Sequence, residues 1–144
     1  MTSHLLARVG DERFAFALDR VLEALDAPAL HHPPQRPDGM RGTLRHRGQT
    51  LAVWDGAQAF GITRDGAEGT ALVLDDAGRR VALLVDDAVD VVDIAPEAMR
   101  AAPAGTDGAG LLAGVARDAA GLVRVVRVDM LVSRLVSWGA GRVE

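Results

Sequence analysis

Short apolar runs separated by glycine-containing turns recur along the whole chain, and this pattern constrains the fold more than any other feature. Runs of this length between turn residues are typical of β-strands and too short for long helices. The predicted strands are residues 5–9, 13–18, 70–74, 81–85, 89–94, 111–116 and 122–128, with two more inside 42–55. The run from Val81 to Val85 carries no polar residue, which predicts a strand buried on both faces. The sequence therefore predicts a mainly β protein.

Two short helical segments are expected beside the strands. Asp19 can cap a helical turn over Val21 to Leu25, and Asp129 can cap an amphipathic C-terminal helix. The inward residues of that last helix are expected to be Met130, Leu131, Leu135 and Val136. Between Ala27 and Gly42, four prolines exclude a central strand, so this stretch is predicted to cross the surface as an extended loop or one helical turn.

An internal repeat indicates two similar subdomains. The stretch from Gly42 to Asp55 (GTLRHRGQTLAVWD) has the plan glycine, short strand, glycine turn, apolar strand, aspartate, and the stretch from Gly114 to Asp129 repeats it. Chance similarity between hairpins is the competing explanation. We expect one domain over residues 1–144, with a first lobe over 1–66 and a second over 67–144, and the sequence leaves open which strands the lobes exchange.

Charge and composition favour protein partners over other ligands. The formal charge of −4 and the lack of a basic block predict no binding to nucleic acid or to an anionic membrane. Cysteine is absent, the N-terminus lacks a signal-peptide pattern, and no apolar run has the roughly 20 residues of a membrane span, which together predict a cytoplasmic protein without membrane insertion.

Two places stand out as candidate partner-binding sites. Arg47 precedes Gly48 in a predicted tight turn, where a guanidinium can make a bidentate contact with a carboxylate or a carbonyl of a partner. Val21 and Glu23 share a face if their segment is extended, which sets an apolar contact beside a charge. The competing interpretations are a solvated turn arginine and a surface glutamate beside a core valine.

Catalytic, metal and cofactor sites are not expected. The aspartates at positions 75, 76, 86, 87, 90 and 93 fit neither a calcium loop nor a two-metal motif. The four histidines have no zinc-site spacing, and the few serines lie in a terminus or the last helix, where no Ser/His/Asp arrangement can be proposed. We therefore predict a protein that is not an enzyme and that carries no cofactor.

In order and spacing, these segments resemble the CheW family of chemotaxis coupling proteins. The first match is LLARVG, DERFAFAL and the segment Val21 to Leu25, followed by a proline-bearing linker. The second runs from Gly42 through Arg47-Gly48 to Asp55, with Phe60-Gly61 after it, and the third from Ala82 to Val92. The closing turn and helix match residues 114–135.

The resemblance implies a non-catalytic adaptor of two SH3-like, five-stranded β-barrel subdomains with short helices, including a C-terminal one. It implies partners of two kinds, a CheA-type histidine kinase through its regulatory domain and the cytoplasmic tips of chemoreceptors. Partner-binding residues carried over from the family motifs are Val21, Glu23, Gly42, Arg47 and Gly48.

The chain departs from the family pattern at Arg45-His46, where Asn-Leu is usual, at Ala52, where proline is usual, and at Gly56-Ala57, where Leu-Arg is usual. With these departures, a role in a non-flagellar pathway that controls pili or gliding stays open beside a role in flagellar chemotaxis. Two other classes stay open, a small ligand-binding regulatory β-barrel and a small hydrolase or isomerase that uses an acid pair such as Asp86 and Asp90.

Overall fold

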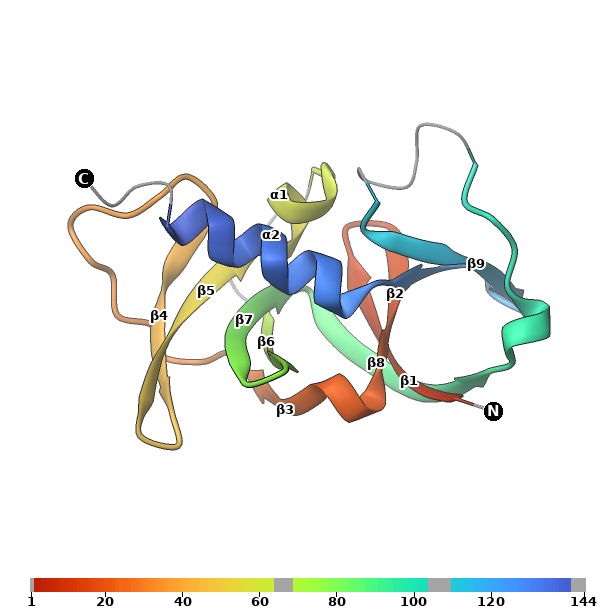
Figure 1. The fold of residues 1–144 in the computed structure, drawn as a ribbon, viewed down its shortest axis with the longest axis horizontal. Helices are drawn as coiled ribbons and strands as arrows, with labels where there is room; N and C mark the ends of the chain where they lie inside the picture. Colours follow the sequence, from red (N-terminus) through yellow and green to blue (C-terminus); the bar gives the residue numbers. More distant parts are fainter. Residues whose placement is uncertain (1, 64–68, 104–109, 141–144) are drawn as a thin grey trace.

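The computed structural model describes residues 2–63, 69–103 and 110–140, and this part of the chain is mainly β (Figure 1). The strands are β1 (Thr2–Val9), β2 (Glu12–Ala17), β3 (Val21–Asp26), β4 (Met40–His46), β5 (Gln49–Asp55), β6 (Thr70–Asp76), β7 (Arg79–Val85), β8 (Asp87–Ile94), β9 (Leu112–Asp118) and β10 (Gly121–Val126). Two α-helices, α1 (Gly56–Phe60) and α2 (Val128–Ala140), and two 3₁₀ turns, η1 (Leu18–Arg20) and η2 (Pro96–Ala98), complete the described elements.

The strands form two five-stranded sheets, which confirms the predicted architecture of two β subdomains. Sheet 1 has the order β8-β1-β2-β10-β9, and sheet 2 has the order β3-β6-β7-β5-β4. Each sheet is antiparallel except for one parallel pair, β2 with β10 in sheet 1 and β7 with β5 in sheet 2.

The two sheets have the same arrangement of strands, but each sheet takes its first hairpin from the other half of the chain. Position by position, the strands β8, β1, β2, β10 and β9 correspond to β3, β6, β7, β5 and β4. Neither sheet follows the expected lobes 1–66 and 67–144, because the hairpin β1–β2 joins β8, β9 and β10, whereas the hairpin β6–β7 joins β3, β4 and β5. The repeat therefore divides the sequence into two halves, and each sheet contains strands from both halves.

Hydrophobic side chains pack into a central cluster between the sheets and into one smaller cluster on each sheet. The central cluster joins Phe14 of sheet 1 to Trp54 of sheet 2 and to Leu131 of α2, which packs on β6 and β7 (Figure 1). Phe14 stacks on Phe60 with ring centroids 4.2 Å apart. The predicted burial of β7 on both faces is confirmed, since its residues Val81 to Val85 alternate between the central cluster and the sheet 2 cluster.

Both hairpins of sheet 2 end in two-residue turns of the same conformation. Arg47 (φ 51°) and Gly48 (φ 81°) form one turn, and Ala77 (φ 52°) and Gly78 (φ 88°) form the other. Positive φ at both central residues is the type I′ geometry that matches the twist of a β-hairpin. The predicted left-handed conformation of Gly48 is confirmed, and Arg47 adopts it too.

The helical predictions need three corrections. The segment from Val21 onward is strand β3 rather than a helical turn, because it pairs with β6, and Asp19 lies inside the short turn η1 instead of capping a helix. Helix α1 was not predicted: its five residues are too few to show a period, although Asp55 accepts a hydrogen bond from the Ala57 amide at 3.3 Å as its N-cap. In α2, Met130 and Val136 are exposed, and the buried stripe is Leu131, Val132 and Leu135.

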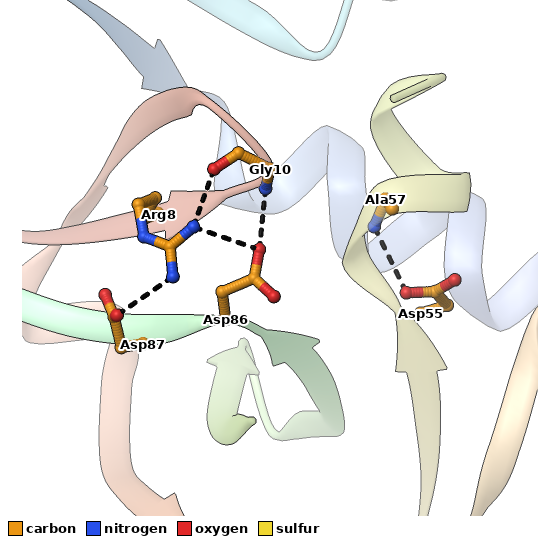
Figure 2. A network of polar contacts seen from close by, with 6 residues as sticks. All are labelled: Arg8, Gly10, Asp55, Ala57, Asp86 and Asp87. Atoms are coloured by element: carbon orange, nitrogen blue, oxygen red, sulfur yellow. Dashed lines mark hydrogen bonds and ion pairs between the residues drawn. The ribbon is translucent and has the colours of Figure 1, made fainter. Parts of the chain in front are cut away.

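Asp86 joins the two sheets where the chain passes from β7 to β8 (Figure 2). Its carboxylate accepts a hydrogen bond of 2.6 Å from the Gly10 amide in the β1–β2 turn, and its own amide donates to the Arg8 carbonyl at 2.9 Å. Arg8 donates to the Gly10 carbonyl at 2.8 Å and to Asp87 at 3.2 Å. The network ties a turn of sheet 1 to the end of a sheet 2 strand.

Candidate functional site

A hydrogen bond brings the two expected site segments together at one end of sheet 2. Glu23 lies on β3 and His46 on β4, the two edge strands of that sheet, and His46 Nε2 lies 2.9 Å from Glu23 Oε1. Because His46 directly precedes Arg47 and Gly48, the Glu23 carboxylate stands beside the β4–β5 turn. The structure therefore places Glu23, Arg47 and Gly48 in one region.

Arg47 is exposed at the tip of its hairpin and makes no hydrogen bond or ion pair to any other described residue. The neighbouring Arg45 supports the turn instead, because its guanidinium donates to the Gly48 carbonyl at 3.2 Å. A free five-donor guanidinium on a rigid turn can contact a carboxylate of a partner.

Val21 and Glu23 do not share a face, contrary to the sequence-based expectation. Val21 pairs with Leu74 and Glu23 with the adjacent Val73, so a β-bulge between them shifts the alternation by one residue. Val21 is partly buried against the central cluster, whereas the Glu23 side chain is 45% exposed. The apolar and charged parts of this segment consequently lie on opposite sides of β3.

Gly42 is buried, and its surroundings give it a role in backbone packing. A Cβ atom at Gly42 would lie 2.6 Å from the His31 carbonyl oxygen, where the loop pairs with Thr43 through two hydrogen bonds of 2.8 Å. Gly114 repeats this geometry in sheet 1, with a Cβ position 2.5 Å from the Arg100 carbonyl oxygen. The match between the repeats shows that glycine is required where a loop crosses an edge strand.

An apolar patch that the sequence did not single out lies on sheet 1 and η1. We define it as Leu5, Leu18 and Val91. Leu5 pairs with Val91, which is 52% exposed, so both lie on one face of the sheet. Leu18 is 38% exposed and borders a hollow of about 410 Å³ that Ser3 also lines. The sequence signal for this patch is the mixture of valine and aspartate in β8, which by itself predicts a strand but not an exposed apolar surface.

Charged side chains on the short turn η1 border this patch. Arg20 donates to Asp76 at 2.8 Å, and Arg79 donates to the other oxygen of Asp76 at 2.6 Å. The hydrogen bond from Arg79, followed by that from Arg20, holds the pKa of the Asp76 carboxyl below its ordinary value. The ion pair from Arg20 fastens η1 to the end of β6, and Arg79 holds the same Asp76 carboxylate from within the β6–β7 hairpin. The Arg20 pair thereby helps to fix the position of Leu18.

Two grooves occupy equivalent places in the two sheets. The larger, of about 720 Å³, lies between β3 and β4 and is lined in part by Leu25, His31 and Arg45. The smaller, of about 490 Å³, lies along β9 and is lined in part by Arg100 and Arg117. Within residues 2–63, 69–103 and 110–140, no three histidine, aspartate or glutamate side chains gather as metal ligands would, and no helix is long and apolar enough to cross a membrane.

Comparisons with known proteins agree with this architecture. The family model described as the CheW-like domain matches residues 3–136. Among solved structures, the chain is similar to the scaffolding protein TtCheW from Thermoanaerobacter tengcongensis, with a TM-score of 0.80, 19% sequence identity and coverage of 90% of this chain and 91% of that one. No curated protein matches the chain. The structural likeness establishes the fold, and because the family model spans nearly the whole sequence, the chain belongs to the family of CheW-like domains.

Proposed function

We propose that this chain is a non-catalytic adaptor that couples chemoreceptors to a CheA-type histidine kinase in the cytoplasm. The observation that carries the proposal is the match to the CheW-like domain over residues 3–136. The similar structure of TtCheW, which is described as a scaffolding protein, supports a role in assembly.

The surface of the molecule supports contacts with proteins of two kinds. The apolar patch around Leu18 and Val91 offers exposed hydrophobic area on a rigid sheet, which is suited to an apolar helix or strand of a partner. The region of Glu23 and Arg47 offers one free cation beside a carboxylate, which is suited to a polar rim. An adaptor needs two such surfaces, because it must hold two partners at once.

The proposal is tested by titrating the chain with a kinase regulatory domain and with a receptor tip fragment taken from the same gene neighbourhood. The variants are Arg47→Asn, Glu23→Ala and Val91→Ser. We choose asparagine at position 47 because it tolerates the left-handed conformation of the turn while it removes the guanidinium. Val21 is left unchanged, since it packs against the central cluster and its truncation would weaken the fold.

We expect micromolar or tighter binding by the parent and a loss of about thirtyfold for a variant that removes a true hot spot, which corresponds to about 2 kcal/mol. The unfolding midpoints of the variants should stay close to that of the parent. Arg36→Asn is the matched control, because Arg36 is exposed in the proline loop. A folded parent that binds neither probe at 100 μM would overturn the proposal.

The output of the pathway is a separate part of the same proposal. A flagellar pathway and a pathway that controls pili or gliding both require an adaptor of this kind, and the departures at Arg45-His46 favour neither by themselves. The identity of the neighbouring motility genes separates the two.

A further inference from the structure

A ring of polar side chains closes one end of sheet 2, and each of its five strands contributes one member. The strand register places all five side chains on the face of sheet 2 that carries the sheet 2 cluster. On each strand, the polar residue is the next one on that face after the apolar residues of the cluster. The members are Glu23 of β3, His46 of β4, Gln49 of β5, Asp75 of β6 and Arg80 of β7. Direct contacts link neighbours: Arg80 donates to Gln49 at 3.3 Å and lies 3.7 Å from Asp75.

His46 differs from the other members of this ring because it is buried. Its side chain is 4% exposed, against 45% for Glu23, 30% for Asp75 and 31% for Arg80. The carboxylate oxygen of Glu23 can only accept, so the hydrogen of this contact is on His46 Nε2. The other ring nitrogen, Nδ1, is buried and has no hydrogen-bond partner among the described residues.

This arrangement is unfavourable for the fold taken alone. A buried nitrogen without a partner destabilises the folded state, and Leu44, two residues earlier on the same face, shows that an apolar side chain fits this face. What His46 achieves is to hold one oxygen of an exposed carboxylate in place. A local arrangement that costs stability while it orders an exposed charged group is typical of a functional site.

We propose that His46 is a positioning residue, which fixes the Glu23 carboxylate beside the Arg47 turn in the orientation that a partner binds. The inference rests on the proposed adaptor function and specifies how its polar surface is organised. Without His46, the Glu23 side chain samples several rotamers, and ordering it on binding lowers the affinity for the partner. His46 thus acts through Glu23 and does not itself touch the partner.

The test is a set of titrations with the kinase regulatory domain and with the receptor tip fragment. His46→Leu should weaken binding to the partner that contacts Glu23 by about fivefold, the cost of ordering one long side chain. The same variant should raise the unfolding midpoint by about 3 °C, because it removes the unpartnered nitrogen. In a Glu23→Ala background, His46→Leu should change affinity no further, because the group it positions is gone.

Rescue separates positioning from packing. His46→Gln places an amide nitrogen near the position of Nε2 and should bind nearly as well as the parent, whereas His46→Asn reaches only the position of Nδ1 and should bind like His46→Leu. This pair replaces His46→Leu if that variant does not fold. His4→Leu is the matched control, a buried histidine of sheet 1 that should leave binding unchanged.

The outcomes distinguish this inference from the function on which it rests. A parent that binds neither probe refutes the adaptor function and the inference with it. A parent that binds while His46→Leu binds equally well, or while His46→Leu weakens binding to the same extent without Glu23, refutes the role of His46 alone.

Discussion

Replacing Asp86 with alanine should destabilise the protein strongly, because this carboxylate holds the two sheets together (Figure 2). The variant removes the acceptor of the 2.6 Å hydrogen bond from the Gly10 amide, and hydrogen bonds to charged groups contribute about 1.5–3 kcal/mol. The ion pair of Asp86 with Arg8 is longer, at 3.7 Å, and Arg8 is 44% exposed, so it adds about 0.5 kcal/mol at most. We expect a loss of about 2–3 kcal/mol.

The neighbouring Asp87 provides a matched control within the same network. It also pairs with Arg8, at 3.2 Å, but its side chain is 51% exposed, and within the described residues no backbone amide donates to its carboxylate. Asp87→Ala should therefore cost no more than about 0.5 kcal/mol. Asp86→Asn keeps an oxygen acceptor for the Gly10 amide, so its loss in free energy of unfolding should lie between those of Asp86→Ala and Asp87→Ala.

Urea unfolding followed by fluorescence of the two tryptophans measures these differences. We expect an unchanged slope and a lower midpoint for Asp86→Ala, with a melting temperature lower by about 6–10 °C. If Asp86→Ala costs less than about 0.5 kcal/mol, or if Asp87→Ala costs as much, the carboxylate of Asp86 does not join the sheets as we argue.

Two further predictions concern the repeat and the charges of sheet 1. Gly114→Ala should lower the free energy of unfolding by about 2–3 kcal/mol, because the new Cβ would lie 2.5 Å from the Arg100 carbonyl oxygen. Gly78→Ala has open space around the new Cβ and should lower it by about 1 kcal/mol. Equal losses for the two variants in urea unfolding would contradict the steric argument. The two hydrogen bonds from Arg13 lower the pKa of the Asp118 carboxyl from 3.8 to about 2. Its stabilising effect is therefore complete above pH 3.8 and is lost as the pH falls through about 2. A carboxyl-carbon NMR titration should show this low pKa, and Arg13→Gln should return it toward the ordinary value; an unchanged pKa would refute the assignment.

The strands were predictable from the sequence because short apolar runs and glycine turns are local features. The two turns of sheet 2 show this well, since Gly48 and Gly78 mark them in the sequence. The segment from Val21 was predicted as a helical turn because its pairing with β6 involves residues about fifty positions away. The exchange of hairpins between the sheets is also a long-range feature and is not visible in the sequence. A hairpin such as β1–β2 would bury the same apolar face in either sheet.

The candidate site was predictable only in part. Arg47 and Gly48 stood out because a charged residue beside a turn glycine is a local pattern, and the structure places them at an exposed tip. The sequence shows His46 only as a departure from the family pattern and as one of four histidines without zinc-site spacing. Its contact with Glu23 depends on the curvature that brings the two edge strands together. Gly42 looked like a member of the motif, but its buried position follows from a loop that crosses the strand.

The most direct test of the adaptor function is whether the chain holds both partners at once. In a sedimentation experiment, the kinase regulatory domain and the receptor tip fragment are mixed with and without this protein. The account predicts that the two partners sediment together only when the protein is present, and that the Glu23→Ala and Val91→Ser variants reduce this joint complex. Partners that never sediment together, or that do so equally well without the protein, would contradict the account.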